Sequence, residues 1–220
     1  AVGDIRKKIW TQAIYARVIE EHIKLNPELR PAILFAPGVE ESVWFVDEYA
    51  KRGIRAAHID GDDVYRDGIR SSSNQERRDE ILNAVRTGEI KVVCNRWVMK
   101  EGLDVPELYH LILATPIGSV VTHTQIVGRV LRNHKTMPTR DFGNGKEQPY
   151  CIIQDHGGNW HRHPSPNADM EDIWRQYYRC GSAKEVTDER MDALRNGNED
   201  NSDPLTKEVG YECPACHAIQ

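Results

Sequence analysis

Short apolar runs alternate with amphipathic segments over the first two thirds of the chain. The apolar runs predict strands, and the segments between them repeat apolar residues at helical spacing. Helix-stopping residues such as Asn26-Pro27, Gly53 and Gly88 separate the two kinds of segment. This alternation predicts an α/β fold with a parallel sheet that helices cover on both faces. We expect strands at 32–36, 54–59, 89–94, 111–114 and 150–154, and helices at 4–25, 39–52, 71–87 and 119–133.

The last third of the chain has a different character. Residues 135–149 are rich in turn formers and predict a projecting hairpin or loop. A helix is expected at 170–179, whereas residues 181–210 are polar and typical of a linker. The predicted domains are a connecting helix or linker (1–27), a sheet domain (28–165), a helix with a polar linker (166–210) and a flexible tail (211–220).

Several loops that follow the predicted strands carry candidate functional residues. Gly61-Asp62 follows the second strand, the 94–104 loop follows the third, and Thr115-Pro116 follows the fourth. In open α/β sheets, ligands bind beyond the carboxyl ends of the strands. We therefore expect a ligand-binding edge where these loops meet.

Composition and charge restrict the possible partners. The 220 residues carry a net charge of −5 with a pI of about 6.0, so nucleic-acid contact would depend on a local basic patch. No apolar run is long enough for a membrane span. Five scattered cysteines indicate a reducing compartment, and we expect a cytoplasmic protein, nucleoid-associated if bacterial. The start at Ala1 without an initiator methionine suggests a processed product or a fragment. The candidate basic patch consists of Arg129, Arg132, His134, Lys135 and Arg140.

The segment 122–132 (THTQIVGRVLR) is the most informative stretch of the chain. At helical spacing, Gln125, Gly128, Arg129 and Arg132 share one side of a helix. Arginine offers a fixed fork of donors and a permanent charge, which suits a phosphoryl group. The segment resembles motif VI of superfamily 2 helicases. The resemblance implies that Arg129 and Arg132 are arginine fingers and that Gln125 orients the nucleotide or water.

A second segment, Glu101-Gly102-Leu103-Asp104-Val105-Pro106, resembles motif V of the same helicases. The resemblance implies that Gly102 and Asp104 contact the nucleotide and couple it to a nucleic-acid groove. Gly102 would permit close backbone approach, and the Asp104 carboxylate would accept a hydrogen bond from a hydroxyl. Many relatives have a threonine near the start of this loop for a nucleic-acid phosphate, whereas this chain has Asn95 and Arg96 there. We assign Asn95, Arg96 and Gly61 to the nucleic-acid groove.

Residues 28–165 as a whole resemble the C-terminal, RecA-like domain of these helicases. The chain has no Gly-x-x-x-x-Gly-Lys-Ser/Thr and no Asp-Glu box, so the phosphate cradle and the magnesium carboxylates would lie on an N-terminal lobe. The expected function is half of an ATP-dependent DNA helicase or translocase that uses ATP and Mg2+, and this half alone should be inactive. RNA is a less favoured partner than DNA. The alternatives are a non-catalytic nucleic-acid-binding regulatory subunit and the motor part of a restriction or repair complex.

Cysteine and histidine clusters near the end of the chain raise the question of a metal. Cys213 and Cys216 have the spacing of two zinc ligands, followed by His217, so they form half of a zinc ribbon or two free thiols. A full site would need a second pair from elsewhere. The histidines of segment 156–163 have no evident carboxylate partners, so capping or contact with DNA or nucleotide is favoured over a catalytic metal.

Overall fold

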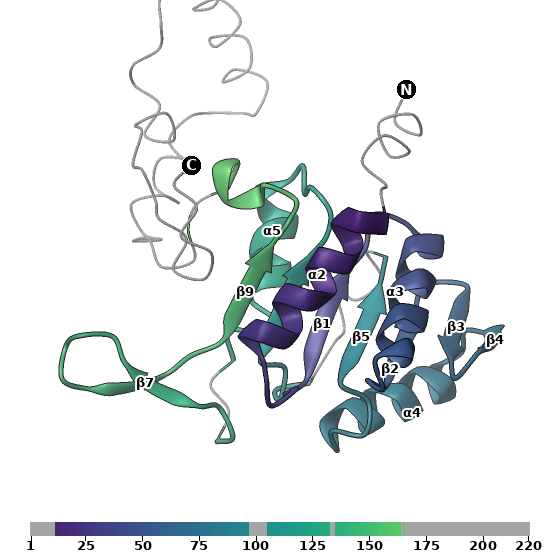
Figure 1. Ribbon diagram of the computed structural model, residues 1–220, viewed down its shortest axis with the longest axis horizontal. Helices are drawn as coiled ribbons and strands as arrows, with labels where there is room; N and C mark the ends of the chain where they lie inside the picture. The colour runs from purple at the N-terminus through teal and green to yellow at the C-terminus, as the bar shows by residue number, and fades with distance from the viewer. Residues whose placement is uncertain (1–11, 97–104, 133–134, 164, 166–220) are drawn as a thin grey trace, which may run out of the picture. The chain divides into compact units, whose positions relative to one another are not determined.

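The computed structural model of the protein describes residues 12–96, 105–132, 135–163 and 165. The fold is built on one seven-stranded sheet with the order β4-β3-β2-β5-β1-β6-β9 (Figure 1). The chain divides into compact units at 1–159 and 160–220, and this sheet belongs to the first. Its strands are β1 (Ala32–Phe35), β2 (Ala56–Ile59), β3 (Asp63–Arg66), β4 (Ile69–Ser72), β5 (Val92–Asn95), β6 (His110–Leu113) and β9 (Ile152–Asp155).

The central strands are parallel. β2 pairs with β5, β5 with β1, β1 with β6, and β6 with β9, all in the same direction. β3 and β4 add an antiparallel edge beside β2. The expected RecA-like α/β fold, with a mostly parallel sheet, is thus confirmed.

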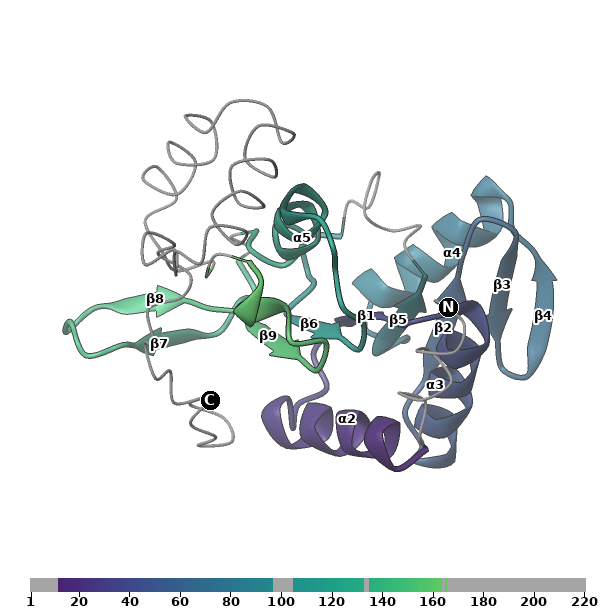
Figure 2. The ribbon, with the colours of Figure 1, turned by 90° about the horizontal axis from the view of Figure 1, so that it is seen from above.

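Helices cover both faces of this sheet, as Figure 2 shows from above. α2 (Gln12–Leu25) and α3 (Val39–Lys51) pack on one face, and α4 (Gln75–Arg86) and α5 (Val120–Val127) pack on the other. Alternate strand residues supply the two cores, since successive side chains of a strand point to opposite faces. Leu34 of β1 lies in the α2–α3 core, for example, and its neighbour Phe35 lies in the α4–α5 core.

The helix boundaries follow local chemistry. The Asn74 side chain caps α4 by accepting a hydrogen bond from the Arg77 amide at 2.8 Å, and Ser119 caps α5 through the Thr122 amide at 3.4 Å. Gly53 and Gly88 follow α3 and α4 with positive φ values of 72° and 73°. A left-handed residue of this kind favours glycine just past a helix end.

Two sequence predictions are wrong. Residues 63–72, expected in part as a helix start, form the β3–β4 hairpin, and α4 begins only at Gln75. The helix expected over 119–133 ends at Val127. The Arg129 amide donates to the Ile126 carbonyl at 3.0 Å and the Val130 amide to Val127 at 3.1 Å, so the chain tightens into a turn there.

A second, two-stranded sheet confirms the hairpin expected in 135–149. It consists of β7 (Thr139–Asp141) and β8 (Glu147–Pro149) and extends away from the main sheet (Figures 1 and 2). A short 3-10 helix, η2 (Asn159–His161), follows β9. None of the helices in the described ranges has the length and apolar character needed to cross a membrane. The segments 101–104, 170–179, 181–210 and 211–220 lie outside the described residues.

Candidate functional site

The carboxyl ends of the five parallel strands form one row across the sheet. The pairing registers place Ile59 opposite Asn95, Asn95 opposite Phe35, Phe35 opposite Leu113, and Leu113 opposite Asp155. Loops that leave these strand ends therefore emerge along a single edge. This is the edge at which open α/β sheets bind ligands.

The α5 helix presents one exposed face to solvent. Val121, Gln125 and Gly128 are exposed and stand three or four residues apart, so they share a side of the helix. The opposite side is buried in the α4–α5 core. A Cβ atom added at Gly128 would lie 3.2 Å from the Thr124 carbonyl oxygen, so a side chain there would require a small shift of the backbone. The buried members of α5 and the following turn are His123, Ile126, Val127 and Val130.

Arg129 and Arg132 lie beyond the end of α5 rather than within it. Both are partly buried, and both take part in interactions with their surroundings. The expected grouping of Gln125, Gly128 and two arginines on one regular helix is therefore corrected. The amide and the glycine share the helix face, whereas the guanidiniums belong to the turn and the segment that follows it.

A network around Asn159 fixes the loop that leads into α5. Its Oδ1 accepts from the Ile117 amide at 2.6 Å, and its Nδ2 donates to the Thr115 carbonyl at 3.0 Å and to Asp155 Oδ1 at 2.8 Å. Asp155 Oδ1 also accepts from the Gly157 amide at 2.9 Å. The end of β9 is thus tied to the loop between β6 and α5. The sequence pattern gave no indication of this positioning role of Asn159.

Asp60 organises the end of β2. Its Oδ1 accepts from the amides of Asp62 and Asp63 at 2.7 and 2.6 Å, and its Oδ2 lies 3.1 Å from His58 Nε2. Burial alone would raise the pKa of Asp60, but the two amides and His58 outweigh it and hold the pKa below the usual value. Burial lowers the pKa of His58, and the nearby Asp60 carboxylate opposes that shift. The loop is therefore held with an ionised carboxylate.

The residues assigned to the nucleic-acid groove, Gly61, Asn95 and Arg96, differ in their exposure to solvent. Gly61 is exposed, and its carbonyl accepts from Arg78 Nη2 at 3.1 Å. Asn95 is fully buried, and its Nδ2 donates to the Leu34 carbonyl at 3.0 Å. Arg96, the next residue, is partly exposed at the same edge. The buried Asn95 side chain fits a structural tie between β5 and β1 better than a direct nucleic-acid contact.

The other predicted site residues fall outside the described part of the chain. Gly102 and Asp104 of the second motif, and the possible zinc ligands Cys213 and Cys216, are in this group. Their roles stay predictions. Among the described residues, no group of three or more His, Cys, Asp or Glu side chains is placed to hold a metal ion.

Comparison with known proteins shows the family to which the chain belongs. The model of the family described as "Helicase conserved C-terminal domain" matches residues 15–134, more than half of the chain. A 51.5 kDa protein of Lactococcus phage (isolate 7-9) is 31% identical over 173 residues, which cover 79% of this chain and 33% of that protein. A Saccharomyces cerevisiae protein named as a candidate ATP-dependent helicase, IRC3, is 29% identical over 89 residues, covering 37% of this chain and 13% of that protein.

Solved structures of low identity also match. The helicase domain of Pyrococcus furiosus Hef is 23% identical, with 65% of this chain and 25% of that chain covered and a TM-score of 0.39. The chain spans about a third of the length of the phage relative and a smaller share of the yeast one. From the family match, together with the sheet order and the strand-end loops, the chain belongs to the helicase conserved C-terminal domain family.

Proposed function

We propose that this chain is the C-terminal motor lobe of an ATP-dependent DNA helicase or translocase. The observation that carries the proposal is the exposed α5 face of Gln125 and Gly128, which runs directly into the two partly buried arginines at 129 and 132. Membership of the helicase family implies use of ATP and Mg2+, and C-terminal domains of this family pair with an N-terminal lobe and bind nucleic acid. In the proposal, ATP supplies the free energy and Mg2+ neutralises phosphate charge in a cleft between the lobes.

Each residue of the α5 region has a proposed part. Arg132 is the main arginine finger and Arg129 its neighbour, because a guanidinium carries a permanent charge and donates in a planar fork. Gln125 orients the nucleotide or the attacking water. Gly128 lets the opposite lobe approach without a side chain between them. The Asn159 network supports these roles by holding the loop that starts α5.

The nucleic-acid groove is proposed at the same strand-end edge. Arg96 and the backbone around Gly61 are exposed enough to contact a phosphate. Gly102 and Asp104 complete this groove in the proposal and couple it to the nucleotide. DNA is proposed over RNA because segments 127–132 and 154–159 resemble those of DNA-directed helicases.

Substitution of Arg132 in the two-lobed parent protein tests the proposal. Arg132→Ala should lower DNA-stimulated ATP turnover by about a thousandfold, the scale expected for an arginine finger. Binding of a fluorescent ATP analogue should stay measurable. Arg86→Ala, on the far end of α4, is the matched control and should keep near-normal turnover. Unimpaired turnover in the Arg132 variant would show that the finger assignment is wrong.

A further inference from the structure

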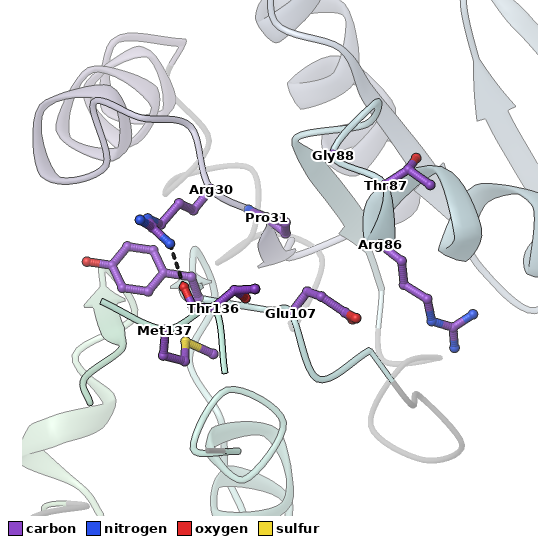
Figure 3. Close-up of a pocket in the computed structure, with 9 residues that line it drawn as sticks. Arg30, Pro31, Arg86, Thr87, Gly88, Glu107, Thr136 and Met137 are labelled. Atoms are coloured by element: carbon purple, nitrogen blue, oxygen red, sulfur yellow. Dashed lines mark hydrogen bonds between the residues drawn. The ribbon is translucent and has the colours of Figure 1, made fainter. Parts of the chain in front are cut away.

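The β7–β8 hairpin projects from the side of the sheet opposite the edge formed by the carboxyl ends of the parallel strands. Its base joins residues that precede strands: Tyr150 comes just before β9, and Tyr109 just before β6. The Tyr150 amide donates to the Pro138 carbonyl at 3.1 Å. Arg30, which precedes β1, donates from Nη1 to the Thr136 carbonyl at 2.7 Å, a bond drawn in Figure 3. The hairpin is thus attached to the amino-end side of the sheet.

Aromatic rings and guanidiniums run in a continuous line from the hairpin tip to this base. The Phe142 and Tyr150 ring centroids are 6.1 Å apart, and those of Tyr150 and Tyr109 are 5.7 Å apart, both nearly edge-on. The Arg140 guanidinium lies over Phe142 at 6.0 Å, and that of Arg30 lies over Tyr109 at 5.7 Å. We call these five residues the aromatic stripe.

Exposure along the aromatic stripe increases toward the tip. Tyr109 is 5% exposed, Tyr150 is partly buried, and Phe142 is 60% exposed. Burial in the domain core explains why an aromatic residue stands at position 109. It does not explain why a phenylalanine stands at the end of a polar hairpin. More than half of the Phe142 residue is therefore accessible to a separate partner molecule.

Asp141 ties the hairpin tip together through hydrogen bonds. Its Oδ1 accepts from the amides of Gly143, Asn144 and Gly145 at 2.8, 3.0 and 3.1 Å. Gly143 and Gly145 have φ values of 93° and 71°, a conformation that side-chain-bearing residues avoid. A fixed tip loses little conformational entropy when it binds a ligand. The Phe142 ring is therefore presented by a preorganised turn.

The charges of the hairpin favour an anionic partner. Its two acidic side chains keep their charge but are held by internal hydrogen bonds, since Asp141 caps the tip and Glu147 accepts from Thr139 Oγ1 at 2.6 Å. Three cations against these two carboxylates leave segment 135–149 with a net charge of +1. The exposed cations are Lys135, Arg140 and Lys146. Rings that stack on bases, next to cations that contact phosphates, are the combination by which proteins hold single strands.

A small cavity adjoins the base of the aromatic stripe (Figure 3). It has a volume of about 220 Å³, and its walls include Pro31, Met137 and Tyr109. Arg30, Arg86 and Glu107 also line it. The exposed hairpin cations Lys135, Arg140 and Lys146 are not part of this lining, so the phosphate contacts considered below do not depend on the cavity.

We propose that the β7–β8 hairpin binds an unpaired nucleic-acid strand, with a base stacked on Phe142 and phosphates against Arg140 and Lys146. This contact lies away from the strand-end edge at which the motor groove is proposed. It rests on the proposed function in that the ligand is nucleic acid. It extends that function by giving the lobe a second contact for the strand outside the groove.

The test measures binding of a fluorescein-labelled oligothymidylate to the 220-residue chain by fluorescence anisotropy, without ATP. Phe142→Ala should weaken binding about five- to hundredfold, the range expected for loss of one stacked base. Phe142→Trp should retain binding because the ring face is kept. Arg140→Ala and Lys146→Ala should each reduce the slope of log K against log salt by up to about one. Ile69→Ala is the matched control, since Ile69 is 67% exposed on the β3–β4 hairpin.

Three outcomes would overturn this inference. If the Phe142→Ala variant is folded by circular dichroism and binds the oligonucleotide as tightly as the parent chain, stacking on Phe142 is excluded. A contact with a protein partner would then be the alternative role of the ring. An equal loss in Ile69→Ala shows a nonspecific effect. If duplex DNA binds as tightly as the single strand, and Phe142→Ala weakens both to the same extent, a preference for an unpaired strand is excluded. Because the assay contains no ATP, its result is separate from the Arg132 turnover experiment, and either proposal can fail alone.

Discussion

A serine, a histidine and an aspartate form a hydrogen-bonded chain that resembles a hydrolase triad. Ser42 Oγ lies 2.7 Å from His58 Nδ1, and His58 Nε2 lies 3.1 Å from Asp60 Oδ2. Ser42 and His58 have no exposed surface, and Asp60 is 6% exposed. A nucleophile must reach its substrate, and this serine does not. These hydrogen bonds instead link α3 to the end of β2 and hold the Asp60 loop at the candidate site.

Gly157 gives the sharpest prediction at the scale of a single residue. A Cβ atom there would lie 2.3 Å from the Thr115 carbonyl oxygen and 2.6 Å from Asn159 Nδ2. Gly157→Ala should force the two loops apart and lower the free energy of unfolding by about 1–3 kcal/mol, as overpacking does. Urea denaturation of the purified chain measures the change.

Gly118→Ala is the control for this variant. Gly118 lies in the loop between β6 and α5, which Gly157 approaches from the loop after β9. No heavy atom lies within 4 Å of a Cβ added at Gly118, and its φ is not positive. Its stability should stay near that of the parent chain. Similar losses of stability in both variants would show that these two loops tolerate no added side chain, and the close approach at Gly157 would not be the cause.

At the scale of elements, α2 covers a buried polar pair. His22 of α2 and His110 of β6 meet edge-on with ring centroids 4.8 Å apart, and both are fully buried. His22 Nδ1 lies 2.9 Å from the Tyr49 hydroxyl of α3, and Asn26 Nδ2 faces His22 Nε2 at 3.4 Å. An amide donor opposite Nε2 requires that nitrogen to accept. The contacts therefore favour a neutral His22 ring.

Acid should weaken the packing of α2. Burial lowers the pKa of His22 to about 4 and that of His110 to about 2, whereas both take up protons near pH 6.5 in the unfolded chain. Below pH 6.5 the unfolded state binds more protons, so stability falls as the pH decreases. The His22 contribution to the free energy of unfolding is roughly 3 kcal/mol, lost between pH 6.5 and pH 4.

Urea midpoints at pH 7.5 and pH 5 measure this dependence. His22→Gln provides the comparison, because the amide can still bond to Tyr49 and Asn26 but does not titrate in this range. The variant should show a smaller decrease between the two pH values than the parent chain. An equal decrease would assign the acid sensitivity to groups other than His22.

The elements also show which parts of the fold the sequence predicted well. The buried strands β1, β5 and β6 are continuous apolar runs, and all three were predicted within two or three residues at each end. β3 and β4 are short, polar and partly exposed, so no apolar pattern marks them. The end of α5 was missed because Arg129, Val130 and Leu131 continue the helical pattern while their backbone tightens.

The candidate site was predictable to a similar extent. Gln125 and Gly128 were placed on a shared exposed face because helical spacing fixes that relation. Asn95 was assigned to nucleic acid because it stands where many related helicases have a threonine, yet it is fully buried and donates a hydrogen bond to the Leu34 carbonyl. A tertiary contact between residues far apart in sequence cannot be obtained from local pattern. The same reason explains why the Asn159 network was missed.

At the scale of the whole molecule, the sequence contains some of the groups that ATP hydrolysis needs and lacks others. Arginines suited to a γ-phosphate are present, but no phosphate-binding loop and no Asp-Glu box occur in the sequence. The net charge of −5 also gives the lobe no general attraction to nucleic acid. Turnover should therefore depend on a second lobe that supplies the phosphate cradle and the magnesium ligands.

The 220-residue chain alone should release phosphate from ATP no faster than buffer does. Addition of a separately expressed N-terminal lobe with a phosphate-binding loop should restore turnover, and DNA should increase it, because closure of the two lobes is proposed to bring Arg129 and Arg132 to the nucleotide. A coupled phosphate-release assay measures all three states. The chain carrying Arg132→Ala should give no restoration with the same lobe. Turnover by the chain alone that disappears in this variant would contradict the requirement for a second lobe, since it would mean that one lobe holds a complete site.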